Sequence, residues 1–180
     1  MKNIFSSSPK FIIGLLATLV FRIFTPFLGL ANISPLMSTI LSGSKAYGKI
    51  AGAAYGFLSM FLLDLIMGKF GLWTWITAVT YALIGILASL YLKDKKANIR
   101  NFVVASIMFT LFFDLITGIF MGPILFGQSI LDATIGQIPF TLRHLIGNII
   151  FAIIFAPWFY RKIMTNESYQ LSKILSLSKY

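Results

Sequence analysis

The chain of 180 residues contains no cysteine and few charged side chains. Asp, Glu, Lys and Arg make up 11% of it, with only five acidic residues and one histidine. The absence of cysteine excludes disulfides and thiolate metal sites. The sequence also lacks a G-x-S-x-G nucleophile turn, an H-E-x-x-H zinc motif and a glycine-rich phosphate loop. It therefore predicts no enzyme, no cofactor, no metal site and no means of hydrolysing ATP.

Hydrophobic side chains are abundant and account for 58% of the residues, a balance typical of integral membrane proteins. A helix needs about 20 mainly apolar residues to cross the hydrocarbon core of a bilayer. The segment 31–47 is shorter and is interrupted by Pro35 and Gly43, so that it is either a sixth span or a short or broken helix. Five other segments meet the length requirement, at about 11–29, 48–68, 73–92, 101–121 and 139–161.

The distribution of basic residues favours six spans with both termini in the cytoplasm. This topology places only Lys69 of the loop and tail cations outside, as the positive-inside rule expects, whereas five spans would place more of them outside. The net charge of +10 then reflects membrane orientation, not nucleic-acid binding. The prediction is an all-α protein of a prokaryotic cell membrane. A six-helix substrate-binding domain over 1–163 precedes a polar cytoplasmic tail at 164–180.

Two aspartates occur in a repeated D-L-I-x-G-x-F pattern, as Asp64 and Asp114. A carboxylate within a membrane span is costly and usually functional. The predicted topology sends both spans outward, so the two aspartates would lie near the outer face and line one pocket, beside a glycine-rich external linker at 122–138 that could cover it. Alternatively, they are helix-end groups that hold the rim of the pocket.

The last span carries a polar stripe of Gln137, Thr141, His144 and Asn148. Offsets of four, seven and eleven residues place all four on one helix face. The stripe either lines a cavity or forms interhelical hydrogen bonds that hold the bundle together.

Three more residues are candidates for the same site. Arg22 lies deep in the first span, where it either pairs with an aspartate or faces a cavity. Trp73 belongs either to an interfacial aromatic belt or to a stacking surface for a flat ligand. Asn32, in the outer turn after the first span, either caps the next helix or projects into the site.

Small residues at four-residue spacing allow helices to approach closely. Gly48, Gly52 and Gly56 form one such series, and Gly14 and Thr18 form a weaker one in the first span. The helix that packs there belongs either to this chain or to a partner subunit. We assign both series to a partner interface.

Several stretches resemble the substrate-binding S components of energy-coupling factor (ECF) transporters. These are ANISPLMSTILSG at 31–43, GAAYGFLSMFLLD at 52–64 with GLWTW at 71–75, and GQIPFTLRHLIGN at 136–148. The resemblance covers about residues 10–162. It implies a bundle that binds a vitamin or similar micronutrient from outside, and that needs a membrane T component and two ATPase subunits for uptake. The A-x-x-x-A coupling pattern of the family has only Gly14 and Thr18 as its counterpart here.

The sequence thus predicts the S component of an ECF-type importer, with an outward cavity and no catalytic residues. The alternatives are a structural or assembly subunit of the membrane, or an intramembrane enzyme that uses Asp64 and Asp114. A cavity bounded by both aspartate helices and the last span would favour transport. Ion pairs from Arg22 to the aspartates would favour the structural role, and contact between the two carboxyls would favour the enzyme.

Overall fold

The computed structural model describes residues 8–25 and 34–165, and within these ranges the chain is helical without a strand. Asn32 and the tail at 166–180 lie outside the described residues, as do the first seven residues. The helices are α1 (Ser8–Phe24), α2 (Leu36–Tyr47), α3 (Lys49–Ile66), α4 (Leu72–Leu92), α5 (Ile99–Asp114), the π-helix η3 (Leu115–Phe120), α6 (Met121–Phe126), α7 (Ile130–Ile154), α8 (Ala156–Phe159) and the π-helix η4 (Tyr160–Met164).

Four stretches of helix are long and apolar enough to cross a membrane: Lys49–Ile66, Leu72–Leu92, Ile99–Phe126 and Ile130–Ile154. They confirm the all-helical membrane character that composition predicts. Large apolar side chains on their outer faces are exposed, as contact with lipid requires. The number of six spans and the side of the membrane on which the termini lie stay predictions.

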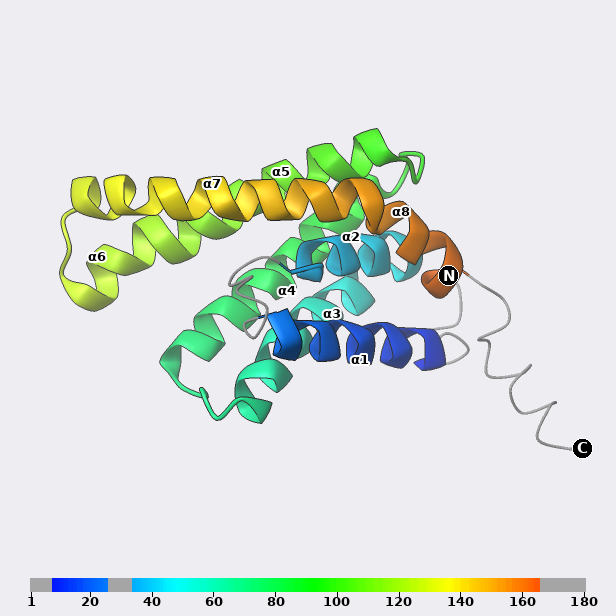
Figure 1. Ribbon diagram of the computed structural model, residues 1–180, viewed down its shortest axis with the longest axis horizontal. Helices are drawn as coiled ribbons and strands as arrows, with labels where there is room; N and C mark the ends of the chain where they lie inside the picture. The colour runs from blue at the N-terminus through cyan, green and yellow to red at the C-terminus, as the bar shows by residue number, and fades with distance from the viewer. Residues whose placement is uncertain (1–7, 26–33, 166–180) are drawn as a thin grey trace, which may run out of the picture.

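The doubtful segment at 31–47 contains a short helix in the middle of the bundle. Helix α2 has 12 residues, or about 18 Å of length, so it does not cross a bilayer alone. All its residues from Leu36 to Ser44 are buried. Figure 1 shows α2 between the α5–α7 pair and the helices α1 and α3, and it contacts each of these elements.

The prediction that 122–138 is a linker is wrong about its secondary structure, because most of the segment is helical. Helix α6 continues directly from η3, and α7 begins already at Ile130, so only residues 127–129 of that segment are outside a helix. Gly127, at φ 64°, ends α6 in the left-handed region that glycine adopts without strain. The result is a helical hairpin, which Figure 1 shows at the opposite end of α7 from α8.

The glycines of α3 pack against α4 of the same chain. A Cβ added to Gly52 would lie 2.7 Å from the Gly85 carbonyl oxygen, and one added to Gly56 would lie 2.6 Å from the Tyr81 carbonyl carbon. The two backbones are therefore in direct contact, as the small-residue spacing predicts. The assignment of Gly52 and Gly56 to a partner interface is corrected, because α4 covers them. Gly48 lies between α2 and α3 at φ 89°, with open space around its Cβ position.

The small residues of α1 also face the interior. A Cβ added to Gly14 would lie 2.6 Å from Met164 Cε and 2.9 Å from Phe159 Cζ. Thr18 is 1% exposed and its Oγ1 is 2.8 Å from the Tyr55 hydroxyl. The partner-interface prediction for Gly14 and Thr18 is corrected as well, since helices α8, η4 and α3 of this chain cover them.

Candidate functional site

A cavity of about 420 Å³ lies at the end of the bundle where α1 and α3 end and α4 and α7 begin. Its lining comes from elements distant in the sequence, with aromatic rings beside hydroxyl, amide, imidazole and guanidinium groups. The lining residues are Arg22, Ser34, Met60, Trp73, Thr77, Tyr81, Phe113, Thr117, Gly118, Gly122, Phe126, Gln128, Gln137, Phe140 and His144.

Arg22 is one of the residues that line this cavity. Its Nη1 donates to Met60 Sδ at 2.8 Å, and Met60 also lines the cavity. In the described part of the chain, no ion pair joins Arg22 to Asp64 or Asp114. A thioether is a weak acceptor, and it is the one hydrogen-bond acceptor of the guanidinium among the described residues, so the other donors can serve a bound molecule. This arrangement favours the cavity alternative for Arg22 over the pairing alternative.

Asp64 lies in the last turn of α3 and not in the cavity lining. Thr74 Oγ1 donates to Asp64 Oδ2 at 2.7 Å and accepts from the Gly71 backbone N–H at 3.2 Å. The carboxylate thus fixes the first turn of α4 through a threonine. Its prediction as a residue that lines the pocket is corrected: Asp64 supports the helix that carries Trp73.

The two tryptophans of α4 have different surroundings. Trp73 lines the cavity, whereas Trp75 packs against Phe57, Phe61 and Phe70 with ring centroids 5.5–6.2 Å apart. Of these two tryptophans, Trp73 is therefore the one that can stack on a molecule in the cavity.

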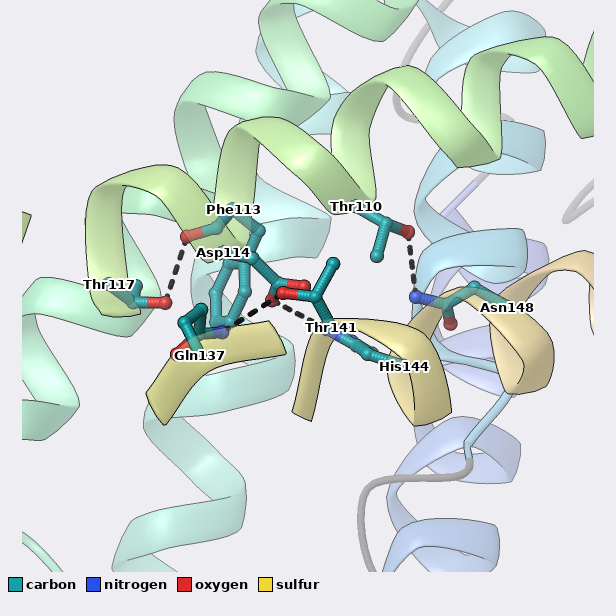
Figure 2. A network of polar contacts seen from close by, with 8 residues as sticks. All are labelled: Thr110, Phe113, Asp114, Thr117, Gln137, Thr141, His144 and Asn148. Carbon is teal, nitrogen blue, oxygen red and sulfur yellow. Dashed lines mark hydrogen bonds and ion pairs between the residues drawn. The ribbon is translucent and has the colours of Figure 1, made fainter. Parts of the chain in front are cut away.

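Asp114 and His144 form a buried contact between α5 and α7. The Nδ1 of His144 is 2.8 Å from Asp114 Oδ1, and the residues are 7% and 2% exposed (Figure 2). Asp114 is the last residue of α5, directly before η3. Such π-turns are frequent at functional sites because they change the direction in which side chains point. His144 lines the cavity, whereas Asp114 lies behind it.

The remaining members of the polar stripe also face α5 and η3, as the helical spacing predicts (Figure 2). Asn148 Nδ2 donates to Thr110 Oγ1 at 2.8 Å, and Gln137 Nε2 donates to Thr141 Oγ1 at 3.3 Å. Gln137 lines the cavity; Thr141 and Asn148 do not. Thr141 instead lines a second, mainly apolar groove, together with Asp114 and Gln137. The stripe therefore divides between the two alternatives, cavity lining and interhelical bonding.

Comparison with protein families gives a match to the ECF-type riboflavin transporter S component over residues 12–156. The match spans most of the chain. The chain belongs to this S-component family. Comparisons with curated proteins and with solved structures gave no match.

The stretch that matches the S-component family contains every residue that lines the cavity, from Arg22 to His144. The two carboxyls of the enzyme hypothesis have separate partners, Thr74 for Asp64 and His144 for Asp114. A filled interior with Arg22 paired to them would have indicated a structural subunit. An open cavity in an S component is instead the arrangement that substrate binding requires.

Several residues of the cavity escaped the sequence analysis. Thr77 and Tyr81 follow Trp73 at four-residue intervals on one face of α4, so the spacing of polar and aromatic residues contained a signal for them. Thr117 and Gly118 lie in the second D-L-I-x-G pattern, but their exposure to the cavity depends on η3. The α6–α7 hairpin, which contributes Gln128, belongs to the segment 122–138 that the sequence placed beside the pocket, but its helical structure was not predicted.

Proposed function

We propose that this S component captures a flavin, or a vitamin of similar shape, from the outer side of a prokaryotic cytoplasmic membrane. A T component and two ATPase subunits then drive its uptake, since the chain has no nucleotide-binding motif of its own. The observation that carries the proposal is the cavity, which combines a flat aromatic surface with hydrogen-bonding groups in a member of the ECF-type riboflavin transporter family.

The size and chemistry of the cavity suit such a ligand. Its volume of about 420 Å³ lies within the range of roughly 300–1,000 Å³ typical of small-molecule sites. A flavin has a flat tricyclic ring with carbonyl acceptors and an imide N–H, and a chain of hydroxyl groups. Trp73 and Phe140 offer ring surfaces, while Arg22, Gln137 and His144 offer polar partners.

The outward orientation rests on the positions of the basic side chains. The cavity end carries Lys69 and the exposed Arg143. The opposite end carries most other cations of the described residues, which supports a cytoplasmic location for that end and for both termini. These cations are Lys10, Lys45, Lys49, Lys93, Lys95, Lys96, Arg100, Arg161 and Lys162.

The test is a binding measurement on the purified chain in lipid nanodiscs. Riboflavin is fluorescent, and we expect its emission to be quenched when it stacks on Trp73. Titration calorimetry with riboflavin, thiamine, biotin and pantothenate would show whether the quenching reflects selective binding. Saturable binding of riboflavin alone supports the proposal, and no binding of any vitamin in the panel refutes it.

A further inference from the structure

Asp114 is a buried carboxylate with one described partner. Its Oδ1 is 2.8 Å from His144 Nδ1, and its Oδ2 has no hydrogen-bond partner among the described residues. Its side chain makes no hydrogen bond to the start of η3 either. A carboxyl group at this depth is costly to leave without partners, and among the described residues the imidazole is its one hydrogen-bond partner.

The contact determines which ring nitrogen of His144 carries a proton. A carboxylate oxygen only accepts hydrogen bonds, so with Asp114 ionised the 2.8 Å contact requires a proton on Nδ1 that is donated to Oδ1. In a neutral ring, Nε2 is then unprotonated and accepts hydrogen bonds. Because Nδ1 points to Asp114, which lies outside the cavity lining, Nε2 is the nitrogen left for the cavity.

Two phenylalanine rings also contact the imidazole of His144. Phe113 and Phe140 contact it edge to face, with centroids 5.7 and 5.5 Å away. Both phenylalanines line the cavity. These contacts hold the ring of His144 in one orientation.

We propose that Asp114 is a positioning residue that makes His144 accept an N–H or O–H group of the ligand through Nε2. The inference rests on the proposed function and extends it. Selection at this point favours ligands with a hydrogen-bond donor, which in a flavin is either the imide N–H of the ring or a hydroxyl of the side chain.

A neighbouring pair of residues provides a matched control. Asn148 and Thr110 lie one helical turn away on the same two helices and are joined at 2.8 Å. They connect α5 to α7 as Asp114 and His144 do, but neither lines the cavity. If Asp114 only holds the helices together, substitutions in the two pairs have the same kind of effect.

The first measurement is the protonation state of His144 by nuclear magnetic resonance. His144 is the only histidine of the sequence, so ¹⁵N-labelled histidine in a protein without a histidine tag reports on this ring alone. We expect Nδ1 to be protonated, Nε2 to be unprotonated, and the Nε2 resonance to shift when riboflavin is added. A ring protonated at Nε2 in the free protein would overturn the proposal.

The second measurement is riboflavin affinity with thermal stability recorded alongside. Asp114→Asn keeps an acceptor for Nδ1 and should retain affinity within about threefold, whereas Asp114→Leu should lose about tenfold. In a His144→Phe background, Asp114→Leu should cause no further loss. Asn148→Leu should leave the affinity of the folded protein unchanged. Equal losses for Asp114→Leu and Asn148→Leu would refute positioning.

Two flavin analogues identify the donor. N3-methylriboflavin lacks the imide N–H, and lumiflavin lacks the hydroxylated chain. The analogue that lacks the donor to His144 Nε2 should bind to the wild type and to Asp114→Leu with the same affinity. If both analogues remain as sensitive to Asp114→Leu as riboflavin is, donor selection is refuted. If the wild type binds no flavin, the proposed function fails, but the ¹⁵N spectrum of His144 still tests the role of Asp114. The same spectrum tests that role if Asp114→Leu does not fold.

Discussion

Replacing Gly56 by alanine tests the contact between α3 and α4. The added Cβ would lie 2.6 Å from the Tyr81 carbonyl carbon and 3.2 Å from the Ala82 amide nitrogen, and closer still to the Tyr81 carbonyl oxygen. All three atoms belong to the backbone of α4, so no side chain can turn away to make room.

The expected cost follows from this geometry. Carbon atoms in good contact are about 3.5–4.0 Å apart, so the methyl group forces the two helices apart by roughly 1 Å. Overpacking of a dense interior costs about 1–3 kcal/mol, and a rigid neighbour puts this case near 3 kcal/mol. For a chain of this length, that corresponds to a fall of roughly 6–12 °C in Tm. Tyr81 lines the cavity, so riboflavin affinity should fall as well.

The assay is a thermal melt in detergent followed by intrinsic fluorescence from the three tryptophans. Gly136→Ala is the matched control, because Gly136 is an exposed residue of α7 and its added Cβ meets nothing within 4 Å. Alanine is the better helix former, by about 1 kcal/mol, so the control should be neutral or slightly stabilising. A Gly56→Ala Tm within about 2 °C of the wild type would show that the helices are not in backbone contact.

Three further substitutions separate ligand contacts from structural ones. Trp73→Ala should lower riboflavin affinity about 10- to 100-fold and abolish fluorescence quenching, because it removes a stacking surface worth about 1–3 kcal/mol. Trp75→Ala should lower Tm in a melt and leave the affinity unchanged. Arg22→Gln should weaken riboflavin binding in calorimetry by about tenfold or more, and Arg143→Gln should not; equal affinities for the two variants would place Arg22 outside the site. Asp64→Leu should destabilise the protein by about 1–3 kcal/mol through the loss of its bond to the α4 turn, and an unchanged Tm in a melt would contradict the structural role given to Asp64.

The helical membrane class and the face of the polar stripe were predictable from the sequence because they depend on local patterns. Long apolar runs report membrane helices, and a 3.6-residue period places His144 and Asn148 on one side of α7 whatever surrounds it. The same pattern does not say which of these two residues lines a cavity. That depends on the point along α7 that lies opposite the junction of α5 and η3, which is a matter of tertiary structure.

The repeated D-L-I-x-G pattern shows most clearly where local reading fails. In the first copy, Gly68 adopts φ 65° after the end of α3, and the chain turns into α4. In the second copy, Gly118 lies within η3, and the helix continues to Phe126. The same sequence pattern thus occurs in two different structures. The first copy leads into a turn, with Asp64 outside the cavity lining, and the second leads into a π-helix, with Asp114 behind the lining. The packing partners of the α3 glycines were likewise a matter of tertiary structure.

The burial of α2 has a consequence for the way in which this protein is made. A helix of 12 residues is too short to be inserted as a stable span, and most of the helices that bury it, α3, α4, α5, α7 and α8, are synthesised later. Ser42 donates to the carbonyl oxygen of Ala156, 114 residues further along the chain. The packing around α2 is therefore complete only when the last helices of the chain are in place.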